Sequence, residues 1–202
     1  MVDLRQFCST DVSRKASRIG LTHPFSRGEW SWATDGHIAI RVPRRADVPE
    51  NLDAPDPTSW WGQHASMAPT FQPLVSLRLP DPMMQTCKAC HGRGFLHDCP
   101  ECTCVCNTCN GASEVAPNHA VRIGIRLISL RYARLIGSLP GAQIAVDARY
   151  PYNIPFLFAG GDGLVVASSL SDDARPVVAS LGSTEAAATS TEAEQRKLLG
   201  LT

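Results

Sequence analysis

The chain has 202 residues, of which 44% are hydrophobic, and its 19 basic residues balance 19 acidic residues. This length allows one ordinary core with a small satellite, and a formal charge of +0 argues against a polycation that binds nucleic acid through its overall charge. The sequence has neither an apolar run of membrane-spanning length nor the basic-then-apolar order of a secretory signal, so we expect a cytoplasmic protein without a membrane partner.

The first segment, residues 3–19, predicts a helix. Asp3 is a suitable N-cap, and apolar residues recur at helical spacing, at Leu4, Phe7, Cys8 and Val12. The charge off this stripe is mainly basic and includes Arg14, Lys15 and Arg18. This segment alone leaves two interpretations open, a solvated helix face or a surface that contacts a partner.

Residues 29–42, EWSWATDGHIAIRV, predict a β-hairpin. Two alternating arms flank Asp35-Gly36, a dipeptide that supplies the positive φ of a type I′ turn. If these two residues form the turn, Trp32 faces Ala39 across the hairpin. The opposite face then collects Ala33, Ile38, Ile40 and Val42.

Prolines are dense over residues 43–82, where they disfavour a regular helix and interrupt any central strand. We therefore predict a long connection over this segment. Trp60 and Trp61 lie within it. These indoles either form a partner-binding patch or lie on the core, because the burial of one indole is favourable by a few kcal/mol.

Seven of the eight cysteines lie between positions 87 and 109, in the segment CKACHGRGFLHDCPECTCVCNTC. They form three Cys-x-x-Cys pairs, Cys87/Cys90, Cys99/Cys102 and Cys106/Cys109, with Cys104 between the last two. Two such pairs complete the tetrahedral sulfur site that Zn²⁺ prefers, and in a reducing compartment clustered cysteines indicate metal ligands rather than disulfides. The segment therefore predicts a zinc module.

The segment after the cysteines predicts a strand and a helix. Residues 121–129 are apolar and β-branched, and Ser129 is a suitable N-cap for a helix that ends near Pro140-Gly141. Its apolar stripe comprises Ile128, Tyr132, Leu135, Ile136 and Leu139. Every charged residue between positions 121 and 143 is an arginine, namely Arg122, Arg126, Arg131 and Arg134.

A strand over residues 143–148 and a second hairpin around Asp162-Gly163 follow. The two hairpin sequences, WSWATDGHIAI and FLFAGGDGLVV, resemble each other, and each follows a predicted helix. This similarity indicates a duplicated helix-plus-strands unit, with coincidence as the alternative. From Ser171 onward the chain is rich in Ala, Ser, Thr and Glu and predicts a flexible tail.

The cysteine segment resembles the Cys-x-x-Cys-x-Gly-x-Gly repeat of DnaJ-type zinc domains. CKACHGRG matches the repeat, and CNTCNGA matches it except for the final glycine. The resemblance implies one zinc ion held by Cys87, Cys90, Cys106 and Cys109. A second zinc would be held by the inner pair Cys99/Cys102, by Cys104 and by a fourth ligand, either His97 or His91.

The flanking segments resemble the bacterial DNA polymerase III β subunit, the sliding clamp, whose domains are duplicated β-α-β-β-β units. ATDGHIAI is similar to the clamp signature, although Ile38 stands where that family usually has arginine. The resemblance implies that the two helices present basic residues to the phosphates of duplex DNA. These residues would be Arg14, Lys15, Arg18, Arg131 and Arg134.

We therefore expect an α+β fold, a duplicated clamp-like domain with a zinc-binding insertion. Its parts are a first half with the Pro-rich connection over residues 1–80, a zinc module over 83–115, a second half over 119–170 and a tail over 171–202. We expect a noncatalytic accessory protein of phage or plasmid DNA replication, whose partners are duplex DNA or replication proteins and whose ring would require a homo-oligomer. The alternative is a zinc-stabilised protein-interaction module without DNA binding, whereas an enzyme is disfavoured because neither a His-Glu-x-x-His nor a deaminase motif is present.

Overall fold

The computed structural model describes residues 1–9, 21–54, 56–58, 61, 69–77, 79, 84–95, 105–106, 109, 111–115, 119–147, 152–169 and 175–182. Within these ranges the chain is mostly β-sheet with one α-helix, α2 (Leu130–Gly137), which fits the α+β class at the coarse level. In the described part, no helix has both the length and the apolar character needed to cross a membrane.

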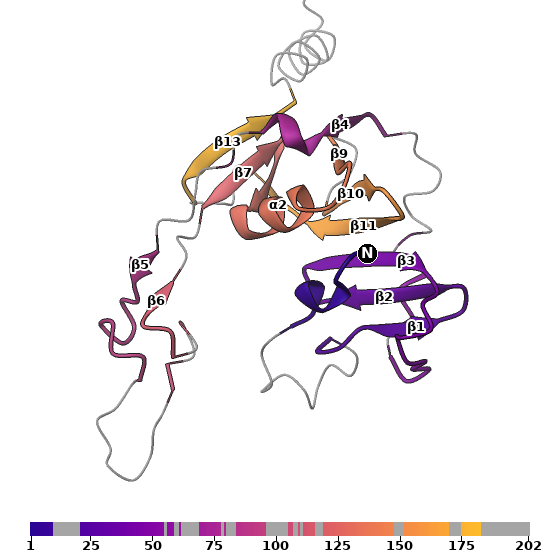
Figure 1. Ribbon diagram of the computed structural model, residues 1–202. Coiled ribbons are helices and arrows are strands. Elements are labelled where there is room, and N and C mark those ends of the chain that lie inside the picture. The colour runs from indigo at the N-terminus through magenta and orange to yellow at the C-terminus, as the bar shows by residue number, and fades with distance from the viewer. Residues whose placement is uncertain are drawn as a thin grey trace, which may run out of the picture.

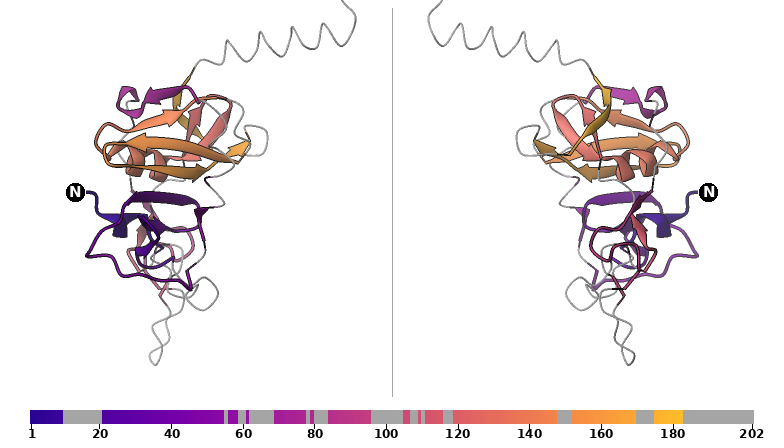
Figure 2. Two further views of the ribbon diagram at one scale, coloured as in Figure 1. Left: turned by 90° about the vertical axis from the view of Figure 1, so that its right-hand side faces the viewer. Right: turned by 90° about the vertical axis from the view of Figure 1, so that its left-hand side faces the viewer.

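A seven-stranded sheet forms the main body of the protein (Figure 1). Its central pair is antiparallel, with β3 and β11 side by side and Ile38 opposite Val165. The side views place the N-terminal strands in the lower part of the body and the C-terminal strands in the upper part (Figure 2). The strand order is β1 (Phe25–Arg27), β2 (Trp30–Thr34), β3 (Ile38–Pro43), β11 (Gly161–Val166), β10 (Asn153–Phe158), β9 (Gln143–Ala145) and β4 (Phe71–Pro73).

A second, four-stranded sheet differs from the predictions in two places. Its order is β12 (Ser168–Ser169), β8 (Arg126–Ser129), β7 (Ala120–Ile123) and β13 (Val177–Leu181). The single strand predicted over residues 121–129 is a hairpin, because the chain turns at Gly124 between β7 and β8. The predicted flexible tail begins too early, because β13 pairs in parallel with β7 and buries Leu181 in the core.

One hydrophobic core joins the two sheets and α2. The helix contributes its buried residues, Leu130, Ala133 and Ile136. Tyr132 and Leu135 of the predicted stripe are only partly buried against this core, so the buried face is rotated from the predicted one. Each buried Leu or Ile side chain stabilises the fold by about 1.5–3 kcal/mol. The core holds α2 firmly against the body and leaves its opposite face outward.

The N-terminal segment begins with a short 3-10 helix, η1 (Leu4–Phe7), followed directly by Cys8. The predicted cap is confirmed, because the Asp3 carboxylate accepts a hydrogen bond from the Arg5 N–H at 3.0 Å. Leu4, Phe7 and Cys8 are buried, and burial raises the pKa of the Cys8 thiol to about 11. The rest of the predicted helix lies outside the described residues.

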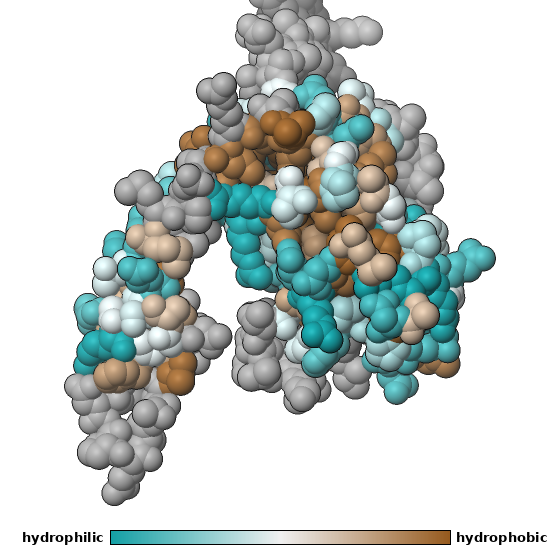
Figure 3. Space-filling model, in the orientation of Figure 1, coloured by the Kyte–Doolittle hydropathy of each residue, from teal (hydrophilic) through white to brown (hydrophobic). Residues whose placement is uncertain are grey.

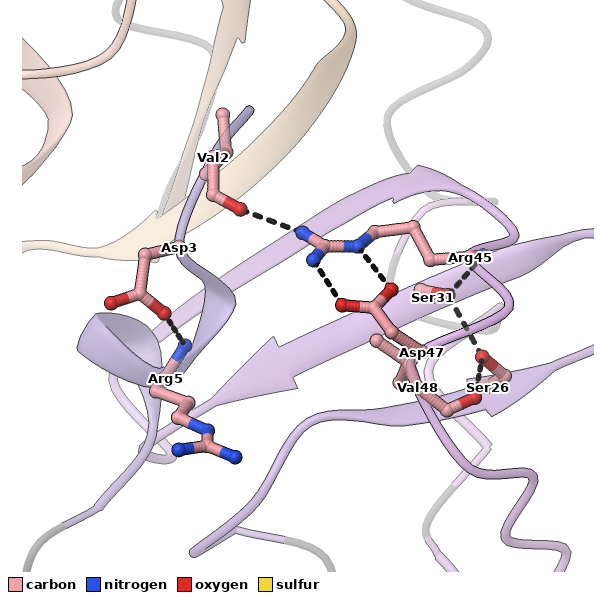
Figure 4. Close-up of polar contacts among 8 residues, drawn as sticks. All are labelled: Val2, Asp3, Arg5, Ser26, Ser31, Arg45, Asp47 and Val48. Carbon is pink, nitrogen blue, oxygen red and sulfur yellow. Dashed lines mark hydrogen bonds and ion pairs between the residues drawn. The ribbon is translucent and has the colours of Figure 1, made fainter.

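Polar contacts tie this segment to the chain that follows β3 (Figure 4). The Arg45 guanidinium donates to the Val2 carbonyl at 2.7 Å and also binds the Asp47 carboxylate. Beneath it, the buried hydroxyls of Ser26 and Ser31 lie 2.8 Å apart, so neither is left unsatisfied. The first strands and the N-terminus therefore form one connected unit.

The first hairpin is confirmed, but its register is shifted from the predicted one. Trp32 lies opposite Arg41 rather than Ala39. The Asp35 carboxylate accepts hydrogen bonds from the His37 and Ile38 N–H groups, which extends the turn beyond the predicted two residues. The shift preserves the faces, and the predicted core-facing residues Ala33, Ile38, Ile40 and Val42 all lie in the main core.

The second hairpin turns at Ala159 and Gly160, so the prediction of a turn at Asp162-Gly163 is wrong. Gly160 has a φ of +96°, which supplies the left-handed conformation that the turn needs. Gly163 instead lies within β11, where a Cβ would stand 2.1 Å from the Phe156 ring. Its glycine is therefore required for close packing of the strand and not for a turn.

Trp61 lies on the other face of the sheet, where it is only 9% exposed. Its ring packs edge-on against Trp32 with centroids 4.9 Å apart, and its Nε1 donates to the Asp162 carboxylate at 2.6 Å. That carboxylate also accepts two hydrogen bonds from Arg41, whose guanidinium lies 5.0 Å from the Trp61 ring centroid. The packed interpretation is confirmed for Trp61, whereas Trp60 lies outside the described residues.

Candidate metal centre

A narrow arm stands away from the body (Figure 1) and carries Cys87, Cys90, Cys106 and Cys109. It begins and ends with two paired strands, β5 (Gln85–Thr86) and β6 (Glu114–Val115). The pairing continues beyond the strands, because the Cys87 N–H donates to the Ser113 carbonyl at 2.9 Å and the Cys106 N–H donates to the Gly94 carbonyl at 2.9 Å. These backbone hydrogen bonds bring two Cys-x-x-Cys turns, which we call knuckles, to one place.

Four thiols converge between the knuckles, those of Cys87, Cys90, Cys106 and Cys109, and their sulfur atoms all lie within 4.8 Å of one another. The Sγ atoms of Cys87 and Cys106 are 3.8 Å apart, and those of Cys90 and Cys109 are 3.7 Å apart. Zinc–sulfur bonds of about 2.3 Å in a tetrahedron require sulfur–sulfur separations of about 3.8 Å. Because a disulfide needs about 2.05 Å, the geometry fits a metal tetrathiolate and not a bonded cystine.

The four sulfur ligands are enclosed by protein. Cys87, Cys90 and Cys106 have no exposed surface, and Cys109 is 7% exposed. With four protein thiolates the tetrahedron is complete, and such closed sites are structural, because catalytic zinc keeps one position for water or substrate. The cluster can therefore hold a metal ion, plausibly zinc, in a structural role.

Backbone donors tune the sulfurs unequally. The Gly94 N–H donates to the Cys90 sulfur at 3.3 Å. Burial alone raises the pKa of Cys90, but this N–H and neighbouring thiols outweigh it and lower the net pKa. Burial raises the pKa of the Cys109 thiol to about 11, and the neighbouring thiols of Cys90 and Cys106 add to this increase. Metal binding at neutral pH must therefore displace protons from this cluster.

The glycine of the first knuckle is required by close packing. Gly94 has a φ of +80°, and a Cβ built there would lie 2.7 Å from the Gly111 carbonyl oxygen. Only glycine lets the two knuckles approach at this point while its N–H faces sulfur. This contact gives a physical reason for the last glycine of the CKACHGRG repeat.

The structure brings together four of the eight predicted metal ligands. Cys99, Cys102, Cys104 and His97 lie outside the described residues, so a second ion stays a prediction. His91, the other histidine considered for that ion, is exposed and does not belong to the four-thiol cluster.

The predicted DNA-binding residues are described only on α2. The Arg131 side chain is 62% exposed, and its Nη2 lies 4.0 Å from the Asp35 carboxylate. Arg134, one turn later, is partly buried. Arg14, Lys15 and Arg18 lie outside the described residues, so the predicted pair of basic helices is described for one member.

Asp35 and Tyr132 connect α2 to the first hairpin, a contact that the sequence did not reveal. The Tyr132 hydroxyl donates to the Asp35 carboxylate at 2.9 Å, and its ring stacks near His37 with centroids 6.4 Å apart. Burial, with the neighbouring Asp35 charge, raises the pKa of the Tyr132 phenol. The sequence signal for this contact was weak: Tyr132 places a hydroxyl on the apolar stripe of the helix, and Asp35 places a carboxylate in the hairpin turn.

Comparisons of the chain with protein-family models, with curated proteins and with solved structures found no match. The metal-binding assignment rests on the spacing, burial and convergence of the four thiols.

Proposed function

We propose that this chain is a noncatalytic, zinc-stabilised DNA-associated protein with a clamp-like body, acting as an accessory factor in phage or plasmid replication. The observation that carries the first part of this proposal is the closed set of four buried sulfur ligands. A metal held in this way orders the chain around it and leaves no coordination position for a reacting molecule.

The order of the seven-stranded sheet supports a duplicated body. From the contact between β3 and β11 outward, the order is β3-β2-β1 in one direction and β11-β10-β9 in the other, with β4 beyond β9. Three strands that are consecutive in sequence therefore lie on each side of this contact in mirrored order. An approximate two-fold axis between β3 and β11 would exchange the two sets. α2 precedes the second set, as the helix predicted over residues 3–19 precedes the first. Among the described residues no strand precedes η1 in the first half, whereas β7 and β8 precede α2, so the order supports a duplicated unit of one helix and three strands.

The charge of α2 supports DNA as the partner. Its two charged residues, Arg131 and Arg134, are both basic, and Arg131 extends into solvent from a helix whose other face is buried. Contacts between arginine and backbone phosphates are independent of sequence, as a protein that moves along DNA requires. The nearby Asp35 offsets part of this charge, so Arg131 would exchange one carboxylate contact for phosphate.

Duplex binding tests the proposal directly. Fluorescence anisotropy with labelled duplex DNA should show binding that weakens steeply between about 50 and 200 mM salt. Arg131→Gln should weaken binding and reduce the salt slope by about 0.9, the value for one lost phosphate contact. Arg44→Gln is a matched control, because this arginine is also exposed but lies in the loop after β3 and pairs with Glu50.

Two results would contradict the DNA proposal. One is the absence of duplex binding at the lowest salt, and the other is an equal effect of the Arg131 and Arg44 substitutions. Native mass spectrometry of the same sample should show at least one zinc ion per chain. A closed ring would appear as a discrete homo-oligomer, whereas a monomer would contradict the ring alone.

The second candidate is a zinc-stabilised protein-interaction module without DNA binding. Exposed apolar residues on the arm favour it, because Phe95 and Val105 are 36% and 48% exposed. Trp61 no longer supports it, since this indole is packed inside the body. This candidate would be favoured if the arm bound a protein ligand and the chain showed no DNA binding at any salt concentration.

A further inference from the structure

The two knuckles that supply the candidate metal ligands differ sharply in the charged residues of their sequences. The first knuckle, CKACHGRG, carries Lys88, His91 and Arg93, and all three are exposed. The second knuckle, CNTCNGA, has no ionisable side chain apart from its two cysteines. The metal site is shared equally between the knuckles, so coordination alone does not explain why the cations gather on one of them.

Charge neutralisation is the ordinary explanation for cations near this site. Four thiolates and one Zn²⁺ carry a net formal charge of about −2, which nearby cations would stabilise. The fold already offsets part of that charge through backbone N–H groups such as that of Gly94. Neutralisation also gives no reason for an aromatic side chain at the same place.

Phe95 follows the first knuckle and has no role in the core of the arm. The apolar cluster of the arm consists of the four metal-binding cysteines with Val115 packed against them, and Phe95 does not belong to it. The ring is 36% exposed at the point where Phe95 bridges to Val105. Figure 3 shows apolar atoms at this end of the described part of the arm. A large aromatic side chain is therefore available on the surface of the arm, beside the exposed Val105.

Arg93 is held beside this ring. Its Nε donates to the Cys90 carbonyl at 3.2 Å, and its guanidinium carbon lies 5.7 Å from the Phe95 ring centroid. The metal-bound turn thus positions a planar cation next to a planar ring. We call the surface formed by Lys88, His91, Arg93 and Phe95 the basic knuckle face.

We propose that the basic knuckle face binds single-stranded nucleic acid, with a base stacked on Phe95 and the backbone phosphates held by Lys88 and Arg93. Aromatic rings flanked by cations bind unpaired bases in this way, because every base has a flat face and every linkage has a negative charge. A duplex keeps its bases stacked inside and would not reach the ring. This inference goes beyond the proposed function, since it requires neither α2 nor duplex binding.

The test uses the zinc-loaded full chain and a labelled oligothymidylate of about 12 nucleotides, measured by fluorescence anisotropy at about 50 and 200 mM salt. Phe95→Ala should weaken binding about tenfold, the loss expected for one stacked base, and Phe95→Trp should retain it. Lys88→Gln should reduce the salt slope by about 0.7, the value for one phosphate contact on a single strand. Met84→Ala, an exposed apolar residue outside the knuckles, is the control and should change nothing.

The zinc content of each variant separates ligand binding from metal stabilisation. Lys88→Gln should retain full zinc by native mass spectrometry, whereas a purely neutralising lysine would affect zinc retention and leave oligonucleotide binding unchanged. If Phe95→Ala loses zinc, Phe95→Leu decides, because leucine keeps the apolar contact and removes the stacking surface. Arg131→Gln should leave single-strand binding intact, so failure of the duplex proposal is recognisable separately.

Three outcomes would overturn the proposal. These are no binding of oligothymidylate at low salt, equal losses for Phe95→Ala and Met84→Ala, and Phe95-dependent binding of an acidic peptide by a chain that does not bind the oligonucleotide. The last result would make this surface a protein-docking site.

Discussion

The arm and the body of this protein are stabilised by different means. Among the described residues, the main core of the body contains 25 buried residues, drawn chiefly from the two sheets, α2 and the N-terminal segment. Within the described part of the arm, a buried cluster of four cysteines has Val115 packed against it. A segment with so little apolar surface cannot offset its conformational entropy by burial alone, so its order depends on what the thiols bind. We therefore expect the arm and the body to have independent sources of stability.

Removal of zinc should have the largest effect and should be confined to the arm. Binding free energies of structural zinc are about 10–16 kcal/mol at neutral pH, far more than the arm can gain from packing. We expect a chelator to abolish hydrogen-exchange protection in residues 84–95 and 111–115 while protection in residues 120–145 persists. Cys90→Ser should reproduce this loss, and Cys8→Ser, at a buried thiol outside the cluster, should not affect zinc content. Loss of protection throughout the body would show that the two regions are not independent.

A cavity in the core of the body should lower the stability of the body and leave the arm unaffected. Ile136→Ala removes a fully buried side chain of α2 and should lower the free energy of unfolding by about 2–5 kcal/mol. Zinc affinity should remain unchanged, because the substituted residue belongs to a separate cluster. Urea denaturation and a zinc competition assay measure the two quantities, and Leu135→Ala, at a partly buried position, should cost less. A matching loss of zinc affinity would contradict the separation.

The Arg41–Asp162 pair should contribute an intermediate amount within the body. Asp162→Asn removes one charge of a doubly hydrogen-bonded ion pair and weakens the acceptor of the Trp61 indole, so we expect a loss of about 1–3 kcal/mol. Tryptophan fluorescence during urea denaturation reports both the stability and the environment of Trp61. Asp47→Asn is the control, because this carboxylate is exposed and binds Arg45 only at the surface. Equal stability of the two variants would show that the partly buried Arg41–Asp162 pair contributes no more than a surface pair.

The smallest effect should appear at alkaline pH. The pKa of Tyr132 is raised in the folded chain, so above about pH 10 the unfolded chain ionises this phenol while the folded chain keeps its proton. The unfolded state then binds fewer protons, and stability falls as the pH rises. Tyr132→Phe should make this alkaline decline shallower when unfolding free energies are compared between about pH 8 and pH 11. An identical decline in both proteins would exclude Tyr132 as a contributor.

The metal site was predictable from sequence because its information is local. Two Cys-x-x-Cys turns with following glycines specify their own geometry, and the four ligands that come together are those expected from the repeat. The hairpin turns were less predictable, because Asp-Gly occurs in both segments with different roles. At residue 35 the Asp carboxylate shapes a turn, whereas Asp162 meets Arg41 from a strand that is 121 residues away in sequence.

Long-range pairing also explains the other differences. β13 is a short segment, VVASL, without a regular alternation of apolar and polar residues, and its place in the sheet depends on pairing with β7, which no local pattern reveals. The contact of Tyr132 with Asp35 joins residues 97 positions apart. Predictions of periodicity can identify the faces of strands correctly, as at Ile38 and Ile40, without identifying the partner across the sheet.

The pairing of Gln85 with Val115 has a consequence for how such a chain can be assembled and altered. Directly paired residues on antiparallel strands have Cα atoms only about 5 Å apart, so the arm leaves its host at nearly the point where it entered. A short glycine-rich bridge can therefore replace everything between these positions without stretching the body. By the same geometry, we expect that the arm could be grafted into a surface loop of an unrelated protein, where its folding would depend on metal binding.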